Sequence, residues 1–332
     1  MIKKTYIYII FILGLVACQS KPKTTAIADV RWPFSADSAY SYISQQMAFG
    51  PRVPLSSAHK ACGDWLVEEL QRLGAQVEEQ YGTMMDYAGE EQEIRNIIAR
   101  IPGTTPAAIM LCAHWDTRPW SDEEEDYDDR FTPVPGANDG ASGVGVILEI
   151  ARQLQCLRST DMATSLPTVE IIFFDCEDKG TPTHYTGPER NDSWCLGSQY
   201  WAKEYAKTPV QERRKYQYGI LLDMVGDPSA TFPKEYFSTR YAANHVENIW
   251  HVAQRLGYGR YFIAQPSYPI TDDHLYVNTI AGIPCVDIID YKVNNQTGFA
   301  DWWHTQRDDM RNINKQTLQA VGETVMTTIC SK

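Results

Sequence analysis

Lone acidic and imidazole side chains follow several apolar, strand-like runs of this chain. They are His114, Asp139, Glu177, Asp178, Asp223 and His304. In open α/β sheets, loops at the carboxyl ends of the strands bring such side chains from distant parts of the sequence into one pocket. Carboxylates and imidazoles together form a typical zinc shell, and a further carboxylate nearby can act as a base. The pattern therefore predicts a zinc enzyme.

Several of these residues also have a structural interpretation. Asp139 lies in the small-residue turn Gly-Ala-Asn-Asp-Gly-Ala-Ser-Gly and could be a helix N-cap. Glu177 and Asp178 could form a solvated turn, although two adjacent carboxylates repel each other. Their pairing is easier to understand if one binds a metal and the other holds a proton. His114 could be a ligand or a group that supports the ligands, and the sequence leaves that open.

Strands that alternate with helices must position these residues. Strands are expected at 96–101, 107–112, 168–174, 218–222 and 285–289, and helices at 38–49, 58–73, 141–155, 193–205 and 314–330. Several strands are apolar at successive positions, which is typical of burial on both faces. This order predicts an α/β fold, a three-layer α/β/α sandwich with a central mixed, mostly parallel sheet. Without an internal repeat or a strong break, residues 32–332 are expected to form a single zinc-dependent catalytic domain.

The composition is that of a folded, acidic protein. Of its 332 residues 43% are hydrophobic, and the net charge is −12. Nucleic acid is excluded as a partner, because phosphate binding needs a basic face. The segment Ser121–Arg130 holds seven acids. It is interpreted as a solvated loop rather than a calcium loop, because its spacing does not match an EF-hand.

The N-terminus predicts export and a lipid anchor. Two lysines precede a mostly apolar run, 5–16, that is too short for a comfortable membrane span. The run ends in Leu-Val-Ala-Cys, which resembles the lipobox of bacterial lipoproteins, where the signal is cut before an acylated cysteine. We expect residues 1–17 to be the signal peptide and 18–31 the lipidated Cys18 with a tether. The protein would then face the periplasm of a bacterial cell envelope, anchored to the outer membrane. The alternatives are an ordinary signal peptide or a membrane anchor.

The remaining cysteines do not form the pattern of a small disulfide scaffold. Cys112 and Cys285 lie in apolar runs and are expected to pack as small hydrophobic residues. Cys176 and Cys195 could form a disulfide near the predicted site, which the sequence leaves open.

The order of the motifs resembles the zinc aminopeptidase superfamily. Four stretches are similar to the glutaminyl cyclases (glutaminyl-peptide cyclotransferases) of the animal type and their bacterial relatives. They are Phe-Asp-Cys-Glu-Asp at 174–178, Leu-Asp-Met-Val-Gly-Asp-Pro-Ser-Ala-Thr-Phe-Pro at 222–233, Asp-Asp-His at 272–274 and Trp-His-Thr at 303–305. The similarity spans roughly Ser35 to the C-terminus.

The resemblance implies a role for each matching residue. It implies one zinc per chain, held by Asp139, Asp178 and His304. It implies a general acid/base, Glu177, and two acids that bind the substrate amine and share its proton network, Asp223 and Asp272. It implies an aromatic wall around the glutamine side chain, formed by Phe299 and Trp303, to which we add Trp194.

The activity implied is conversion of the N-terminal glutamine of a peptide or protein to pyroglutamate, with release of ammonia. Zinc would polarise the side-chain amide, and Glu177 would move the proton. One alternative is a di-zinc aminopeptidase, with Asp139 bridging the ions and His114 and Asp223 as further ligands. Another is a non-catalytic surface lipoprotein, which predicts a loss of ligands.

The chain also departs from the animal pattern. Asp178 stands where the animal enzymes carry Glu, so either the turn moves inward or the zinc shifts. Asp287 stands at the position of a histidine, and the aromatic residue that closely follows the acid pair is missing. The resemblance therefore leaves the roles of Asp273, His274 and Asp287 open.

Overall fold

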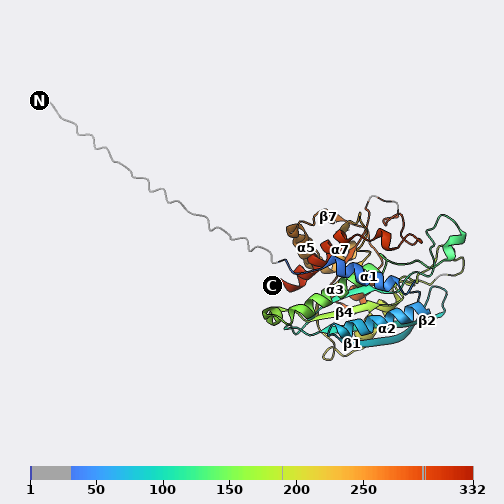
Figure 1. Ribbon diagram of the computed structural model, residues 1–332, viewed down its shortest axis with the longest axis horizontal. Coiled ribbons are helices and arrows are strands. Elements are labelled where there is room, and N and C mark those ends of the chain that lie inside the picture. The colour runs from blue at the N-terminus through green and yellow to red at the C-terminus, as the bar shows by residue number, and fades with distance from the viewer. Residues whose placement is uncertain (2–30, 189, 294, 296, 332) are drawn as a thin grey trace.

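The computed structural model describes residues 1, 31–188, 190–293, 295 and 297–331. The expected signal peptide, the lipidation site Cys18 and all of the tether except Arg31 lie outside these residues. Within the described ranges, no helix has both the length and the apolar character that crossing a membrane requires. Arg31 forms an ion pair with Glu323 of the C-terminal helix, so the chain enters the fold close to where it ends (Figure 1).

A six-stranded sheet forms the centre of the fold. Its strands lie in the order β1 (Gln76–Met85), β2 (Glu91–Ile101), β4 (Val169–Phe174), β3 (Ala108–His114), β5 (Tyr216–Asp223) and β8 (Cys285–Ile289). The β4/β3, β3/β5 and β5/β8 pairs are parallel, whereas β1/β2 and β2/β4 are antiparallel. A smaller sheet pairs β6 (Phe232–Lys234) with β7 (Phe262–Pro266). The predicted mixed, mostly parallel sheet is confirmed.

Helices cover both faces of the large sheet. On one face, α2 (Ser57–Arg72), α3 (Ala141–Leu157) and α5 (Tyr236–Leu256) pack against the strands, and α1 (Ala36–Met47) and α7 (Lys315–Cys330) pack against α3 (Figure 1). The other face packs against α4 (Leu196–Lys207) and α6 (Asp273–Tyr276). Shorter helical segments are η1 (Asp128–Phe131), η2 (Asp161–Ser165), η3 (Val277–Ala281) and η4 (Met310–Asn312).

Alternating residues of the central strands belong to the two hydrophobic cores on opposite faces of the sheet. On β4, Ile171 and Phe173 join the core beneath α3, whereas Ile172 and Phe174 join the core beneath α4. This alternation explains why the strand is apolar at each position from Ile171 to Phe174. The predicted three-layer α/β/α sandwich is confirmed.

Some expectations about individual elements differ from the structure. The helix expected at 193–205 begins only at Leu196, because Cys195 adopts a left-handed conformation with φ 55°. Trp194 is therefore a loop residue. The sequence pattern does not predict β6, α5 or β7. It does not predict β1 either, an edge strand whose side chains are all exposed or only partly buried and which lacks an apolar run.

Candidate metal centre and active site

The three predicted zinc ligands lie together at the carboxyl ends of the parallel strands. Asp178 follows β4, Asp139 precedes α3, and His304 lies in the loop between β8 and α7. Nε2 of His304 lies 3.1 Å from Oδ1 of Asp178 and 3.6 Å from Oδ2 of Asp139. All three side chains are buried, and one potential ligand atom of each lies within 4.8 Å of the others.

The chemistry of this group fits zinc. Oδ2 of Asp178 is buried and has no hydrogen-bond partner among the described residues. An unpaired buried carboxylate oxygen is costly, and a metal ion would satisfy it. Two carboxylates and one imidazole leave a fourth position for water or substrate, as in catalytic zinc sites.

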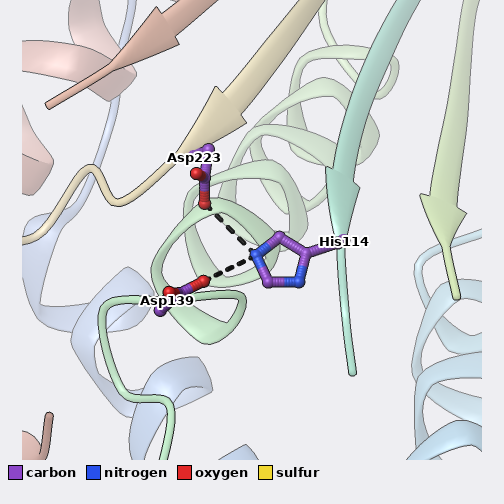
Figure 2. A group of neighbouring side chains, drawn as sticks. All are labelled: His114, Asp139 and Asp223. Carbon is purple, nitrogen blue, oxygen red and sulfur yellow. Dashed lines mark hydrogen bonds and ion pairs between the residues drawn. The ribbon is translucent and has the colours of Figure 1, made fainter. Parts of the chain in front are cut away.

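A second group of metal-compatible side chains shares Asp139. Nε2 of His114 lies 3.0 Å from Oδ1 of Asp139 and 3.2 Å from Oδ1 of Asp223, and both carboxylates point at the same ring nitrogen (Figure 2). Nδ1 of His114 lies 3.5 Å from Asp116. Burial opposes a charge on the ring, but the nearby carboxylates of Asp116, Asp139 and Asp223 raise the pKa of His114 well above its ordinary value. The N-cap of α3 is Gly140, so the interpretation of Asp139 as an N-cap is wrong.

Two further aspartates hold the backbone of the ligand turns. Oxygens of Asp116 accept the N–H of Glu177 at 3.1 Å and that of Asp178 at 3.2 Å. Oxygens of Asp308 accept the N–H of Asp139 at 3.0 Å and that of the preceding residue at 2.7 Å. Burial raises the pKa of Asp308 to about 8. Sequence reasoning missed these two roles, although both residues lie within four positions of a predicted histidine.

Glu177 lies beside the metal group and has its own neighbours. The thiol of Cys195 donates to Oε1 of Glu177 at 3.1 Å, and an oxygen of Asp272 lies within 4.8 Å of both groups. Burial and the nearby charge of Asp272 raise the pKa of Glu177 well above its usual range. Burial also raises the pKa of Asp223 to about 7. These carboxyl groups can therefore accept or hold a proton near neutral pH.

Aromatic rings surround the metal group on its open side. The ring of Trp303 stacks on His304 with centroids 3.5 Å apart, and Phe299 stacks on Trp303 at 4.5 Å. Trp194 lies nearly parallel to His304 at 6.4 Å. A cavity of about 370 Å³ lies between these rings and the acids. All nine residues predicted for metal, proton and substrate line it: Asp139, Glu177, Asp178, Trp194, Asp223, Asp272, Phe299, Trp303 and His304.

The residues whose roles the sequence left open, Asp273, His274 and Asp287, are buried and do not line the cavity. His274 is fully buried, with Nε2 3.0 Å from Glu235 and Nδ1 3.5 Å from Asp287. It is therefore a packed imidazole in contact with two acids. Asp273 is also fully buried and begins α6, directly after its N-cap Asp272.

The expectations for the cysteines and the acidic loop can also be compared with the structure. Cys112 and Cys285 are buried in the core, as predicted. Cys176 and Cys195 are free thiols, so the possible disulfide does not form. The acidic loop is not wholly solvated, since Asp122 is buried.

Comparisons with known proteins agree with this geometry. The sequence model of Peptidase family M28 matches residues 96–329. A solved Tannerella forsythia glutaminyl cyclase is 46% identical with a TM-score of 0.83, covering 90% of this chain and 99% of that one. A solved Zn-dependent exopeptidase of Parabacteroides distasonis is 49% identical with a TM-score of 0.84, covering 91% and 100%. The bovine glutaminyl-peptide cyclotransferase is 26% identical over 287 residues, which are 80% of this chain and 74% of that protein.

Proposed function

Because this chain belongs to Peptidase family M28, we propose that it is a zinc-dependent glutaminyl-peptide cyclotransferase. It converts the N-terminal glutamine of peptides or proteins to pyroglutamate and releases ammonia. The observation that carries the proposal is the stack of Phe299, Trp303 and His304, which places an aromatic wall directly over the metal group. Such a wall suits a cyclisation, which needs no water nucleophile, and the similarity to a bacterial glutaminyl cyclase supports it.

The proposed centre holds one zinc per chain through Asp139, Asp178 and His304. When bound, zinc supplies a Lewis acid that polarises the side-chain amide of the substrate.

The protein's own residues bind the substrate and move its proton. Asp223 and Asp272 hold the α-amine, and the aromatic wall holds the glutamine side chain folded back towards it. Glu177, whose pKa is raised by burial, accepts a proton from the amine. The amine nitrogen then forms a bond to the amide carbon, and the bond from that carbon to the amide nitrogen breaks. Glu177 returns the proton, and the nitrogen leaves as ammonia.

The alternative candidate is a di-zinc aminopeptidase. It is favoured by the second group, because His114 and Asp223 lie next to the shared Asp139 as a second zinc would require. The similarity to a solved Zn-dependent exopeptidase points the same way. In that enzyme Glu177 would activate a water molecule instead of an amine.

A paired assay on protein lacking residues 1–18 tests the proposal. One reaction contains a peptide with an N-terminal glutamine and is monitored by ammonia release. The other contains a leucine peptide and is monitored by free leucine. Ammonia without free amino acid, lost with a chelator and with Glu177→Gln, supports the cyclase. Free leucine together with two zinc ions per chain would replace the proposal with the peptidase.

We further propose that Cys18 carries a lipid that holds the protein on the periplasmic side of the cell envelope, at the outer membrane. The support is the lipobox-like Leu-Val-Ala-Cys alone. The full-length protein should fractionate with membranes, and Cys18→Ser should release it or block its processing. An unlipidated Cys18 in the mass spectrum of the mature protein would contradict the proposal.

A further inference from the structure

Arg118 is a buried cation beside the metal group for which the proposed reaction has no role. It lies four residues after His114 and is only 1% exposed. Its Nε and Nη2 donate to the two oxygens of Asp122 at 2.7 and 2.6 Å, and Asp122 itself is 2% exposed. A buried charge is costly unless it is paired and its remaining donors form hydrogen bonds. The buried pair of Arg118 and Asp122 therefore needs an explanation.

The pair contacts the chain segment that carries a zinc ligand. Nη1 of Arg118 donates to the backbone oxygen of Asp178 at 3.1 Å and lies 3.7 Å from its Oδ1. Nη2 also reaches the backbone oxygen of Thr181 at 3.3 Å. On the other side, Asp122 accepts the N–H of Thr183 at 2.9 Å. The segment 178–183 is thus bound at three backbone positions.

The same guanidinium supports the aromatic wall. It lies over the ring of Trp194, 4.8 Å from its centroid, and 5.7 Å from the centroid of Trp120. Trp194 lines the cavity and is parallel to the ring of His304. A planar guanidinium can stack on a ring and form paired hydrogen bonds at the same time, whereas an ammonium cannot.

We propose that Arg118 and Asp122 form a positioning pair. The pair fixes the position of two parts of the site, the proposed ligand Asp178 and the ring of Trp194. The side chain of Asp178 is one methylene shorter than the glutamate in the animal pattern. The backbone at Asp178 must therefore be fixed close enough to the metal for the carboxylate to reach it. The pair fixes that position through the carbonyl of Asp178, in the way that groups around metal ligands generally orient them. The part about Trp194 rests on the proposed function, whereas the part about Asp178 needs only that the site binds zinc.

The test compares Arg118→Lys with a matched control, Arg152→Lys. Arg152 on α3 also forms a paired contact with a buried carboxylate, Glu149, at 2.6 and 2.9 Å, but neither residue lines the cavity. Zinc affinity is measured by competition with a chelator, and kcat and KM with a glutamine peptide. We expect Arg118→Lys to weaken zinc binding at least about tenfold and to raise KM, because the Lys cannot hold both the turn and the ring. Arg152→Lys should change neither value.

Asp122→Asn provides a second, milder variant in case Arg118→Lys does not fold. It retains the size of the side chain but removes the charge that aligns the guanidinium, so it should shift zinc affinity and KM in the same direction by a smaller factor. Zinc affinity and KM within about twofold of the wild type in both variants would overturn the proposal. An equal loss in Arg152→Lys would do the same, since it would indicate general destabilisation. If the wild type releases no ammonia, the proposed function fails, but the zinc measurement still tests the positioning of Asp178.

Discussion

The two metal-compatible groups share Asp139 and similar residue types, yet they differ in how their charges are balanced. In the His114 group, the ring contacts three acids, Asp116, Asp139 and Asp223, and these contacts raise its pKa despite burial. In the His304 group, burial, followed by the charge of Arg118, lowers the pKa of the imidazole to about 3. These surroundings therefore favour the protonated form of His114 and the neutral form of His304.

This difference supports the proposed zinc site at the His304 group. Zinc binds the neutral form of imidazole, which the lowered pKa of His304 favours. Burial and the charge of Asp139 raise the pKa of Asp178, although Nη1 of Arg118 lies 3.7 Å from its Oδ1. A bound metal ion would stabilise the ionised form of this carboxyl.

In the His114 group, the raised pKa of the imidazole favours a cation that offsets the neighbouring carboxylates. The rings of Trp194 and Trp303 stack on His304. A histidine beside acids can thus be a ligand or an internal counter-ion, and its surroundings decide.

The largest expected effect on activity is that of removing the imidazole of His304. His304→Ala should lose zinc and lower kcat/KM more than about a thousandfold, or about 4 kcal/mol, because one of three ligands disappears. Zinc content by elemental analysis and the ammonia assay measure this. His251→Ala, at an exposed position of α5, is the matched control and should keep both. A His304→Ala protein with full zinc content would place the metal elsewhere.

The aromatic wall gives the next largest effect. Trp303→Leu should lower kcat/KM by about 10- to 100-fold without loss of zinc, because the ring packs the substrate and excludes water but is not a ligand. Trp302→Leu changes the neighbouring tryptophan, which does not line the cavity, and should have little effect. Steady-state kinetics with a glutamine peptide distinguish the two. An equal loss of kcat/KM in both variants would mean that activity depends on the conformation of the whole loop rather than on the ring of Trp303.

Replacing His114 should affect activity less than replacing His304. His114→Gln keeps a hydrogen-bond donor for Asp139 and Asp223 but removes a ring that can carry a positive charge. We expect zinc to remain at one per chain and kcat/KM to fall by about tenfold or less, as for other groups that orient a ligand. Two zinc ions in the wild type and one in this variant would instead support the di-zinc aminopeptidase.

The smallest effect concerns pH. Burial raises the pKa of Asp223 in the folded protein from an ordinary 3.8 to about 7. Between these values the folded protein binds the extra proton, so the contribution of Asp223 to the stability of the metal-free protein is fully present below about pH 4 and is lost as pH rises through about 7. Burial likewise raises the pKa of the proposed ligand Asp178, and zinc binding displaces its proton, so the stabilisation that zinc provides should grow from pH 5 to pH 8 by about 1–2 kcal/mol. Thermal unfolding with zinc and with chelator measures it, and a difference that shrinks as pH rises would contradict it.

Sequence patterns predicted the three-layer fold and nine of the residues that line the cavity, but not other lining residues such as Met224, Ile270 and Tyr291. Parallel strands bring their carboxyl ends to one edge, so residues that follow apolar runs, such as Asp178 and Asp223, could be assigned to one site without coordinates. The same argument could not find Asp116, Asp308 or Arg118. Their roles depend on backbone groups of distant turns, and no spacing along the chain reveals such contacts.

The sequence by itself determined which residue types reach the site, because strand periodicity and loop position are local properties. Only the tertiary structure decided how the two imidazoles differ, because the pKa of His114 depends on the carboxylates of Asp139 and Asp223, which lie 3.0 and 3.2 Å away, and the pKa of His304 depends on its burial. It also decided that Trp194 faces the cavity, through the left-handed backbone at Cys195 that delays α4. Charge balance and ring orientation are cooperative properties of the packed protein.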